Sequence, residues 1–408
     1  MNRTIQIILT LLVAGVGVWL GTSEKFYSEA IISAFFALAL VSVVIIHLRV
    51  APHWQDAAAI AGSTLLLGLV DFRLLHFEPQ LMAWFSFCGM SSLVILGLRT
   101  IWAKAEGQKL LALAFVPAVL YVTSEYFAST FLAWSAAAHA KVFDLYLISF
   151  DGALHVQFPF LAGQAFATWG TLGLISTIFY IALPIPIALI YVGRLLRFGA
   201  KALPSFVALL ATGPVGIAFY NLLPALGPRH IFLGRFPWSP LTIAEISRLF
   251  LEAVPGAGAP NAIPSLHMAW VLLVWWYSRG LSWWERSVAM TFLVFTVLAT
   301  LGTGEHYFID LVVAFPFALM MMALCAFSLR ITDAGRVKGI VFGLAATLGW
   351  EIALRRAPHF FWISPLLPWV LCCGSVALTI LYERRLGMPS AGVVAAPALT
   401  AAEPSPAS

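Results

Sequence analysis

Residues 287–324 read SVAMTFLVFTVLATLGTGEHYFIDLVVAFPFALMMMAL, two apolar runs on either side of the polar stretch GTGEHYFID. An apolar run of about 17–25 residues can cross a membrane as a helix. The two runs therefore predict a pair of transmembrane helices. His306 and Asp310 lie at the turn between them, on one face of the membrane.

The rest of the chain has the same apolar character. Of its 408 residues 61% are hydrophobic and 10% are charged, whereas soluble domains contain about 25% charged residues. This composition excludes a soluble protein and a disordered chain, and predicts an all-α, polytopic membrane protein. The net charge of +5 comes from scattered arginines, so we expect no nucleic-acid partner. The four cysteines lie in apolar runs without C-x-x-C spacing, so we expect no zinc site or disulfide framework.

Further apolar segments predict a helical bundle of about 12 transmembrane helices. The segments are 4–20, 28–48, 56–72, 81–98, 110–134, 170–192, 204–225, 264–280, 287–303, 307–329, 339–354 and 360–382. The tail from Pro389 is rich in alanine, proline and serine, and we expect it to be disordered.

The basic residues are divided unequally between the two sides of this bundle. The side of the N-terminus receives 15 of the 23 lysines and arginines: Arg3, Arg49, Arg99, Lys104, Lys109, Arg194, Arg197, Lys201, Arg279, Arg286, Arg330, Arg336, Lys338, Arg384 and Arg385. The opposite side receives Lys25, Arg73, Lys141, Arg229, Arg235, Arg248, Arg355 and Arg356. Because cytoplasmic loops carry an excess of basic residues, we predict that both termini are cytoplasmic.

Three polar segments meet on the other, extracytoplasmic side. They are GAPNAIPSLH at 258–267, GTGEHYFID at 302–310 and YNLLPALGPRH at 220–230. Asp310 can accept a hydrogen bond from one imidazole nitrogen of His306, four residues earlier, and leave the other nitrogen as a nucleophile. His267 lies in the first turn of a helix, where a phosphate group is favoured and where it could protonate a leaving oxygen.

Two further features bear on this predicted site. Gly302 and Gly304 could let the backbone approach a substrate closely. Glu125 lies within an apolar segment, and an ionisable group at membrane depth is a candidate for function. For Glu125, a buried structural role with hydrogen bonds is equally open.

Pro264-Ser265-Leu266-His267, followed 39 residues later by His306-x-x-x-Asp310, resembles the type 2 phosphatidic acid phosphatase superfamily. The closest resemblance is to its inositol phosphorylceramide synthase branch, which has a segment similar to residues 220–228. The resemblance implies a phosphohistidine at His306, oriented by Asp310, with His267 as the acid. It also implies four regions: N-terminal transmembrane helices at 1–108, a six-helix catalytic core at 109–330, C-terminal transmembrane helices at 331–388, and a disordered tail at 389–408.

The chain departs from the superfamily in its positive charges. Where the phosphatases have Ser-Arg before the nucleophile, this chain has Ala299 and Thr300. Arg229 and Arg235 are the best substitutes as phosphate clamps. With fewer fixed cations, transfer from a phosphodiester lipid is favoured over hydrolysis of a dianionic monoester. The predicted substrate-binding residues are Arg229, Arg235, Ser265 and Tyr220.

Together these observations predict an integral membrane lipid phosphotransferase or phosphoesterase that acts on a lipid-linked phosphate at the extracytoplasmic face. Its expected partners are membrane lipids: a phospholipid or polyprenyl phosphate donor and a lipid acceptor. No metal and no cofactor are expected. Two alternatives stay open: a phosphatase acting on phosphatidic acid or polyprenyl (di)phosphate, and a non-catalytic lipid transporter.

Overall fold

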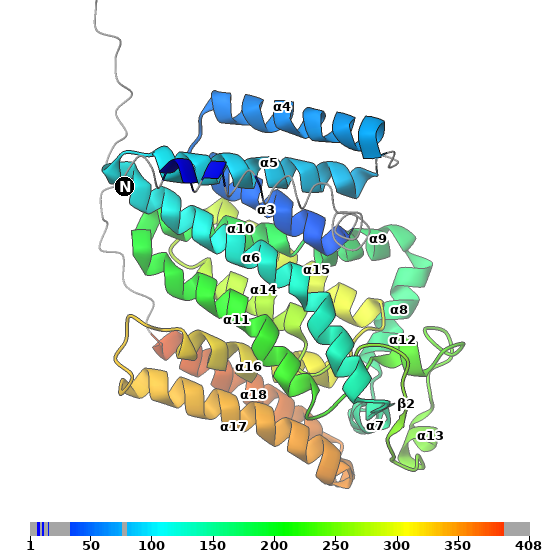
Figure 1. The fold of residues 1–408 in the computed structure, drawn as a ribbon. Coiled ribbons are helices and arrows are strands. Elements are labelled where there is room, and N and C mark those ends of the chain that lie inside the picture. The colour runs from blue at the N-terminus through cyan, green and yellow to red at the C-terminus, as the bar shows by residue number, and fades with distance from the viewer. Residues whose placement is uncertain (1–5, 9, 12–14, 16–32, 76–79, 387–408) are drawn as a thin grey trace, which may run out of the picture.

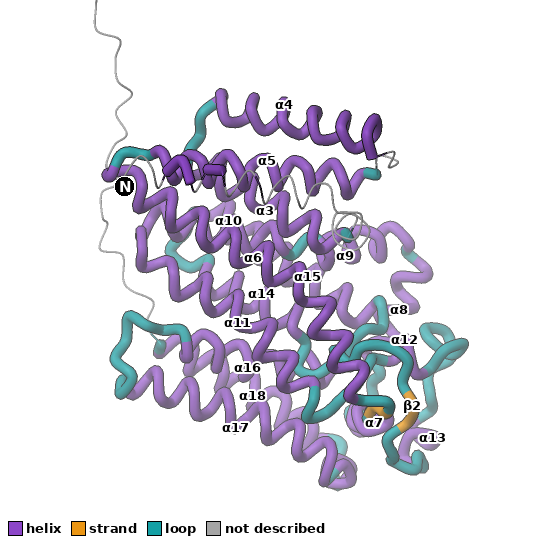
Figure 2. Tube along the Cα trace, viewed as in Figure 1, coloured by secondary structure: helices purple, strands orange, loops and turns teal. Residues whose placement is uncertain are grey.

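The computed structural model describes residues 6–8, 10–11, 15, 33–75 and 80–386, and almost all of its regular structure is helical (Figures 1 and 2). The described residues form one small sheet, in which β1 (Lys141–Val142) pairs antiparallel with β2 (Val254–Pro255). The predicted helical membrane class is therefore confirmed. The predicted helix at 4–20 lies mostly outside the described residues, and the predicted disordered tail lies entirely outside them.

The longer helices fall into three groups along the chain. The N-terminal group contains α3 (Ala34–Val50), α4 (Trp54–Val70), α5 (Leu81–Trp102) and α6 (Ala105–Ala138). The central group contains α7 (Asp144–Ala153), α8 (Phe158–Thr168), α9 (Gly170–Ile181), α10 (Pro184–Phe198), α11 (Leu203–Tyr220), α14 (Leu266–Tyr277), α15 (Trp283–Gly302) and α16 (Phe308–Leu324), with the short α12 (Pro228–Ile231) and α13 (Ile243–Ser247). The C-terminal group contains α17 (Ala334–Arg356) and α18 (Leu366–Arg385).

Every apolar segment predicted from residue 28 onward overlaps a helix, but the count of 12 membrane spans is not confirmed. Among the described residues, six helical stretches are long and apolar enough to cross a membrane, or seven if the bent pair α7–α8 is one span. The difference arises because several predicted segments form shorter helices. With 12 residues each, α9 and α14 are about 18 Å long, less than the ~30 Å of a hydrocarbon core.

One of the six long stretches, Pro184–Tyr220, folds back on itself at Gly199, whose φ is +58°. Just before α10, the ring of Tyr180 stacks on His267 at the start of α14. Arg194, further along α10, donates a hydrogen bond to the Tyr277 carbonyl at the other end of α14. The chain then returns along α11, where Gly216 packs against Leu266. Thus α10 and α11 run in opposite directions beside α14.

The N-terminal and C-terminal groups pack on different sides of the central helices (Figure 1). On one side, α3 contacts α10, α5 and α6, and on the other, α17 and α18 contact α16. The connections that contain α7, α12 and α13 gather at one end of the bundle (Figure 2). We call this end the loop end, and it is where the predicted site residues lie.

Ion pairs at the opposite end of the bundle involve the basic residues that the sequence assigned to the N-terminal side. Arg49 pairs with Glu285 at 3.0 Å, and Arg279 pairs with Glu383. At the loop end, Arg355 donates a hydrogen bond to the Leu222 carbonyl at 2.9 Å. Arg49 and Arg279 therefore lie at the end of the bundle opposite to Arg355.

Candidate active site

His306 lies just before α16, and Asp310 lies in the first turn of that helix. The Asp310 carboxylate accepts a hydrogen bond from the backbone N–H of Tyr307 at 2.7 Å, which satisfies a free amide at the helix start. His306 itself is outside the helix. Its approach to Asp310 therefore depends on this capping turn and not on a shared helix face.

The ring of His306 is buried, and its contacts define which nitrogen carries the proton. Nδ1 lies 2.9 Å from the carbonyl oxygen of Ala262 and 3.5 Å from Oδ2 of Asp310. Since both partners are acceptors, the proton belongs on Nδ1 and the lone pair on Nε2. Nε2 lies 3.3 Å from the hydroxyl of Ser265. The imidazole is thus held in the tautomer that a nucleophile at Nε2 needs.

Ser265 joins the starts of α14 and α16. Its hydroxyl accepts a hydrogen bond from the backbone N–H of Met268 and caps α14. Its own N–H donates to the backbone carbonyl of Asp310 at 3.1 Å. This arrangement brings His267, in the first turn of α14, to the same end of the bundle as His306.

Aromatic rings fix the position of His267. Its ring stacks on Tyr180 with 3.8 Å between centroids and forms a T-shaped pair with Trp270 with 5.8 Å between centroids. No hydrogen bond or ion pair to His267 is found within the described part of the chain. Both of its ring nitrogens are therefore available to a bound molecule.

A cavity of about 360 Å³, which we call the central cavity, connects these groups. His267, His306 and Tyr220 all line it, as does Asn261 from the segment before α14. Of the predicted site residues, Tyr220 thus lies in the wall of the cavity beside both histidines. Ser265 and Asp310 lie behind His306 and contact it.

The loop before α12 packs tightly against the turn that carries His306. The backbone N–H of Arg229 donates to the Gly304 carbonyl at 3.0 Å. Gly227 has a φ of +107°, and a Cβ there would lie 2.3 Å from the Glu305 carbonyl oxygen, so only glycine fits. Side chains would also collide with a Cβ at Gly302 or Gly304. In the structure, Gly302 and Gly304 make room for neighbouring side chains of the protein. The sequence predicted instead that they let the backbone approach a substrate.

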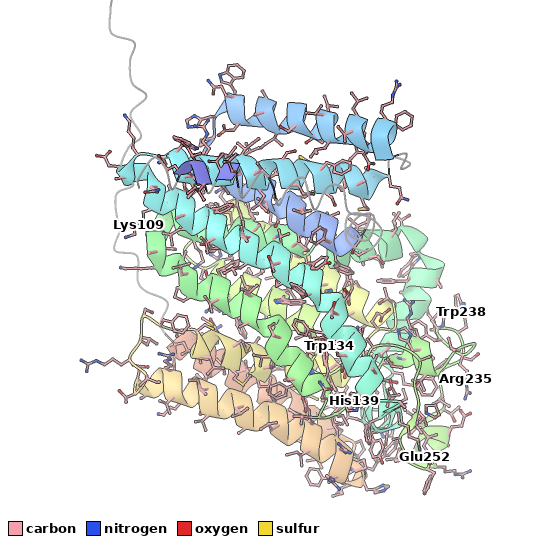
Figure 3. The ribbon with its side chains drawn as sticks, viewed as in Figure 1. Lys109, Trp134, His139, Arg235, Trp238 and Glu252 are labelled. Carbon is pink, nitrogen blue, oxygen red and sulfur yellow. The ribbon has the colours of Figure 1, made fainter. Side chains whose placement is uncertain are left out.

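Both arginines predicted to bind phosphate are already paired with carboxylates. Arg229 lies 2.8 Å from Glu305, which His230 also contacts at 3.2 Å. Arg235 pairs with Glu245 at 3.1 Å, and Figure 3 shows it at the outer edge of the loop end. Neither arginine lines the central cavity.

Glu305, which was not predicted from the sequence, carries the negative charge that pairs with Arg229 and His230. Burial raises the pKa of Glu305, but the hydrogen bond from His230 and the charge of Arg229 outweigh it and hold the pKa below its ordinary value. The charge of Arg229 is therefore largely compensated within the protein. In the sequence, Glu305 stands directly before His306, and that position was the signal that could have identified it as a site residue.

Two buried aspartates on α7 hold the site together and were also missed. Asp144 accepts hydrogen bonds from the N–H of Gly227 at 2.8 Å and from the hydroxyl of Tyr307 at 3.0 Å. Asp151 accepts one from the N–H of Phe308 at 3.3 Å. The two acids are seven residues apart in an apolar segment, so they share a helix face. That spacing is the signal that could have identified them.

Within the described ranges, no group of three or more histidine, cysteine, aspartate or glutamate side chains is arranged to hold a metal ion.

Residues 145–324 match the model of the PAP2 superfamily, whose members are phosphatases or phosphotransferases. No curated protein and no solved structure matches the chain. The matched region begins in α7 and ends with α16, and it contains His267, His306 and Asp310. It supports a phosphoryl-transfer enzyme of the membrane, without support for the inositol phosphorylceramide synthase branch.

Proposed function

We propose that the protein transfers a phosphoryl group from a membrane lipid through a phosphohistidine at His306. The observation that carries this proposal is the 2.9 Å contact between Nδ1 of His306 and the Ala262 carbonyl, with Asp310 at 3.5 Å. These contacts leave the lone pair on Nε2. His267, whose ring has no hydrogen-bond or ion-pair partner among the described residues, lines the same cavity.

In the first step, the Nε2 lone pair of His306 forms a bond to phosphorus. The bond between phosphorus and the leaving oxygen breaks, and its electron pair goes to that oxygen. Protonated His267 gives its proton to the same oxygen. The imidazolium formed at His306 is stabilised by the Asp310 carboxylate, which acts as an orienting and charge-balancing group.

In the second step, His267 takes a proton from the hydroxyl of the acceptor. The acceptor oxygen bonds to phosphorus, the N–P bond breaks, and its electrons return to Nε2 of His306. Water as the acceptor gives hydrolysis, and a lipid alcohol gives transfer. The same residues therefore serve both outcomes.

The pairing of the arginines supports transfer from a phosphodiester. A dianionic phosphate monoester needs more compensating positive charge than a monoanionic diester. Arg229 is neutralised by Glu305, and Arg235 by Glu245. A phosphatase acting on phosphatidic acid or polyprenyl (di)phosphate is thus the second candidate, with water in place of the lipid alcohol.

Labelled lipids test this proposal. The purified protein is incubated with phosphatidylinositol, phosphatidic acid or polyprenyl phosphate, each labelled at phosphorus, together with diacylglycerol or ceramide. We expect label to pass from the diester donor to a lipid acceptor. Release of free phosphate from the monoesters alone would establish the phosphatase instead. Absence of both products would leave the transporter as the explanation.

The proposed orientation puts the loop end outside the cytoplasm, supported by the basic residues at the opposite end. Ala257 at the loop end and Thr332 at the other end are both exposed. In a variant without the four native cysteines, Ala257→Cys is expected to react with an impermeant thiol reagent in intact cells. Thr332→Cys should react only after the membrane is opened. The reverse pattern would place the site on the cytoplasmic side.

A further inference from the structure

The central cavity extends well below the two histidines. Along α6 its lining residues run from Tyr121 to Leu132, and along α11 from Leu209 to Tyr220. Eleven residues of helix correspond to about 16 Å, or half of the ~30 Å hydrocarbon thickness. Figure 3 shows that α6 runs the length of the bundle, from Lys109 at one end to His139 at the loop end. The cavity is therefore deep enough for part of a lipid chain.

Helix α3, which lies outside the PAP2 match, forms part of the wall of this cavity. The ring of Phe35 lies 6.1 Å from the ring of His267. The neighbouring Phe36 forms a T-shaped pair with Tyr126 on α6, with 6.2 Å between ring centroids. Both phenylalanines line the cavity. The N-terminal helices thus complete the cavity with apolar side chains, as a lipid chain requires.

Glu125 of α6 carries the one carboxyl group among the described residues that line this largely apolar cavity, where Ser124, Ser129 and Thr130 of the same helix are its polar neighbours. It lines the cavity and is half-buried. No hydrogen bond or ion pair joins it to any residue that the structure describes. A carboxyl group in apolar surroundings is costly without a hydrogen-bond partner. In either protonation state it offers an acceptor oxygen to a ligand.

The depth of Glu125 restricts which ligand group can reach it. Glu125 precedes Leu132, the lining residue of α6 nearest to the loop end, by seven residues or about 10 Å of helix. Ser135, ten residues after Glu125 or about 15 Å along the helix, donates a hydrogen bond to Asn221 next to Tyr220. Since Tyr220 lines the cavity with both histidines, a lipid with its phosphate at His306 would bring the upper part of its chains to the level of Glu125. A plain hydrocarbon chain offers no hydrogen-bond donor there.

We propose that the central cavity binds the chain region of a lipid substrate and that Glu125 accepts a hydrogen bond from a hydroxyl or amide N–H on that region. Glu125 is a specificity-determining residue in this view. It selects lipids that carry such a donor below the phosphate and discriminates against polyprenyl chains. This inference rests on the proposed function, because that function places a lipid phosphate at His306.

Binding to a catalytically inactive chain tests the inference apart from the chemistry. The full chain with His306→Ala is titrated in detergent micelles with three lipids: ceramide 1-phosphate, phosphatidic acid and polyprenyl phosphate. Only the first carries a hydroxyl and an amide N–H below its phosphate. A hydrogen bond to a carboxyl group corresponds to about tenfold or more in affinity. We expect ceramide 1-phosphate to bind by that factor more tightly than the other two.

Variants of α6 link this preference to Glu125. Glu125→Leu in the same chain should remove the preference, whereas Thr123→Val, at an exposed position outside the cavity, should keep it.

Ceramide 1-phosphate methylated at its hydroxyl or at its amide identifies the donor. Ala128→Phe, which fills the cavity from the same helix, should weaken the binding of ceramide 1-phosphate even if the Glu125 variant fails to fold.

Some results would overturn the inference. These are equal binding of the three lipids, absence of binding, and a preference that survives Glu125→Leu. A preference that depends on Glu125, found together with an unchanged chain that forms no phosphohistidine from any labelled donor, would instead refute the proposed function and leave the inference standing. The two proposals therefore fail in different measurements.

Discussion

Replacement of His306 by alanine is expected to abolish phosphoryl transfer, with a loss of at least about 10⁴-fold in turnover. The change removes Nε2, the atom that forms the bond to phosphorus in the proposed mechanism. Labelled lipid donors measure the loss as missing product and as missing acid-labile label on the protein. The change also removes the contacts of the buried ring with Ala262, Ser265 and Asp310, and a buried polar group left without its partner costs about 1–3 kcal/mol. The melting temperature of the variant therefore has to be measured beside its turnover.

His359→Ala is the matched control for this variant. His359 is exposed at the loop end, in the short helix η4 (Pro358–Trp362) after α17. It should keep full turnover and the same melting temperature. Substantial transfer by the His306 variant, with normal folding, would exclude the phosphohistidine mechanism.

Asp310→Asn is expected to lower kcat by about 10²–10⁴-fold with little change in KM. Asparagine can still accept the hydrogen bond from the Tyr307 N–H, so the start of α16 should be retained. It removes the negative charge 3.5 Å from Nδ1 of His306. The imidazolium that forms during attack on phosphorus then lacks its partner, which affects the transition state more than binding.

Steady-state kinetics of the Asp310→Asn variant distinguish a carboxylate that orients His306 from one that binds the substrate. Asp333→Asn serves as the control, because Asp333 also caps a helix, α17, but lies at the opposite end of the bundle. It should leave kcat unchanged. An Asp310→Asn variant with raised KM and normal kcat would mean that Asp310 binds substrate and does not orient His306.

Hydropathy predicted the helical membrane fold but not the number of spans. Apolar runs locate helices because a helix in a bilayer must cover its backbone with apolar side chains. They do not reveal where such a run bends or stops. The segment 170–192 forms α9 and α10 with a break at Pro184, and 264–280 forms the short α14. Proline and capping residues, and not hydropathy, determine those limits.

The sequence placed His267, His306 and Asp310 at one end of the bundle, which the structure shows, and their roles stay a prediction. It did not reveal the Ala262 carbonyl, because every residue has one and only tertiary packing selects which approaches the imidazole. It also gave Arg235 a role in phosphate binding, although that side chain pairs with Glu245 away from the cavity. That role followed from the resemblance, in which Arg235 substitutes for a missing phosphate clamp, and it stays a prediction.

The hydrogen bond between Asp144 and Tyr307 joins residues that are 163 positions apart. A ribosome makes Asp144 long before it makes Tyr307, so the carboxylate lacks this partner while α8 to α15 enter the membrane. The polar contacts behind His306 form only when α16 arrives. Assembly of the active centre is therefore a late event in biosynthesis. In a chain that stops before α16, Asp144 keeps the hydrogen bond from the Gly227 N–H, but the buried Asp151 lacks the one from the Phe308 N–H. The cost of that buried acid favours removal of such a chain by quality control.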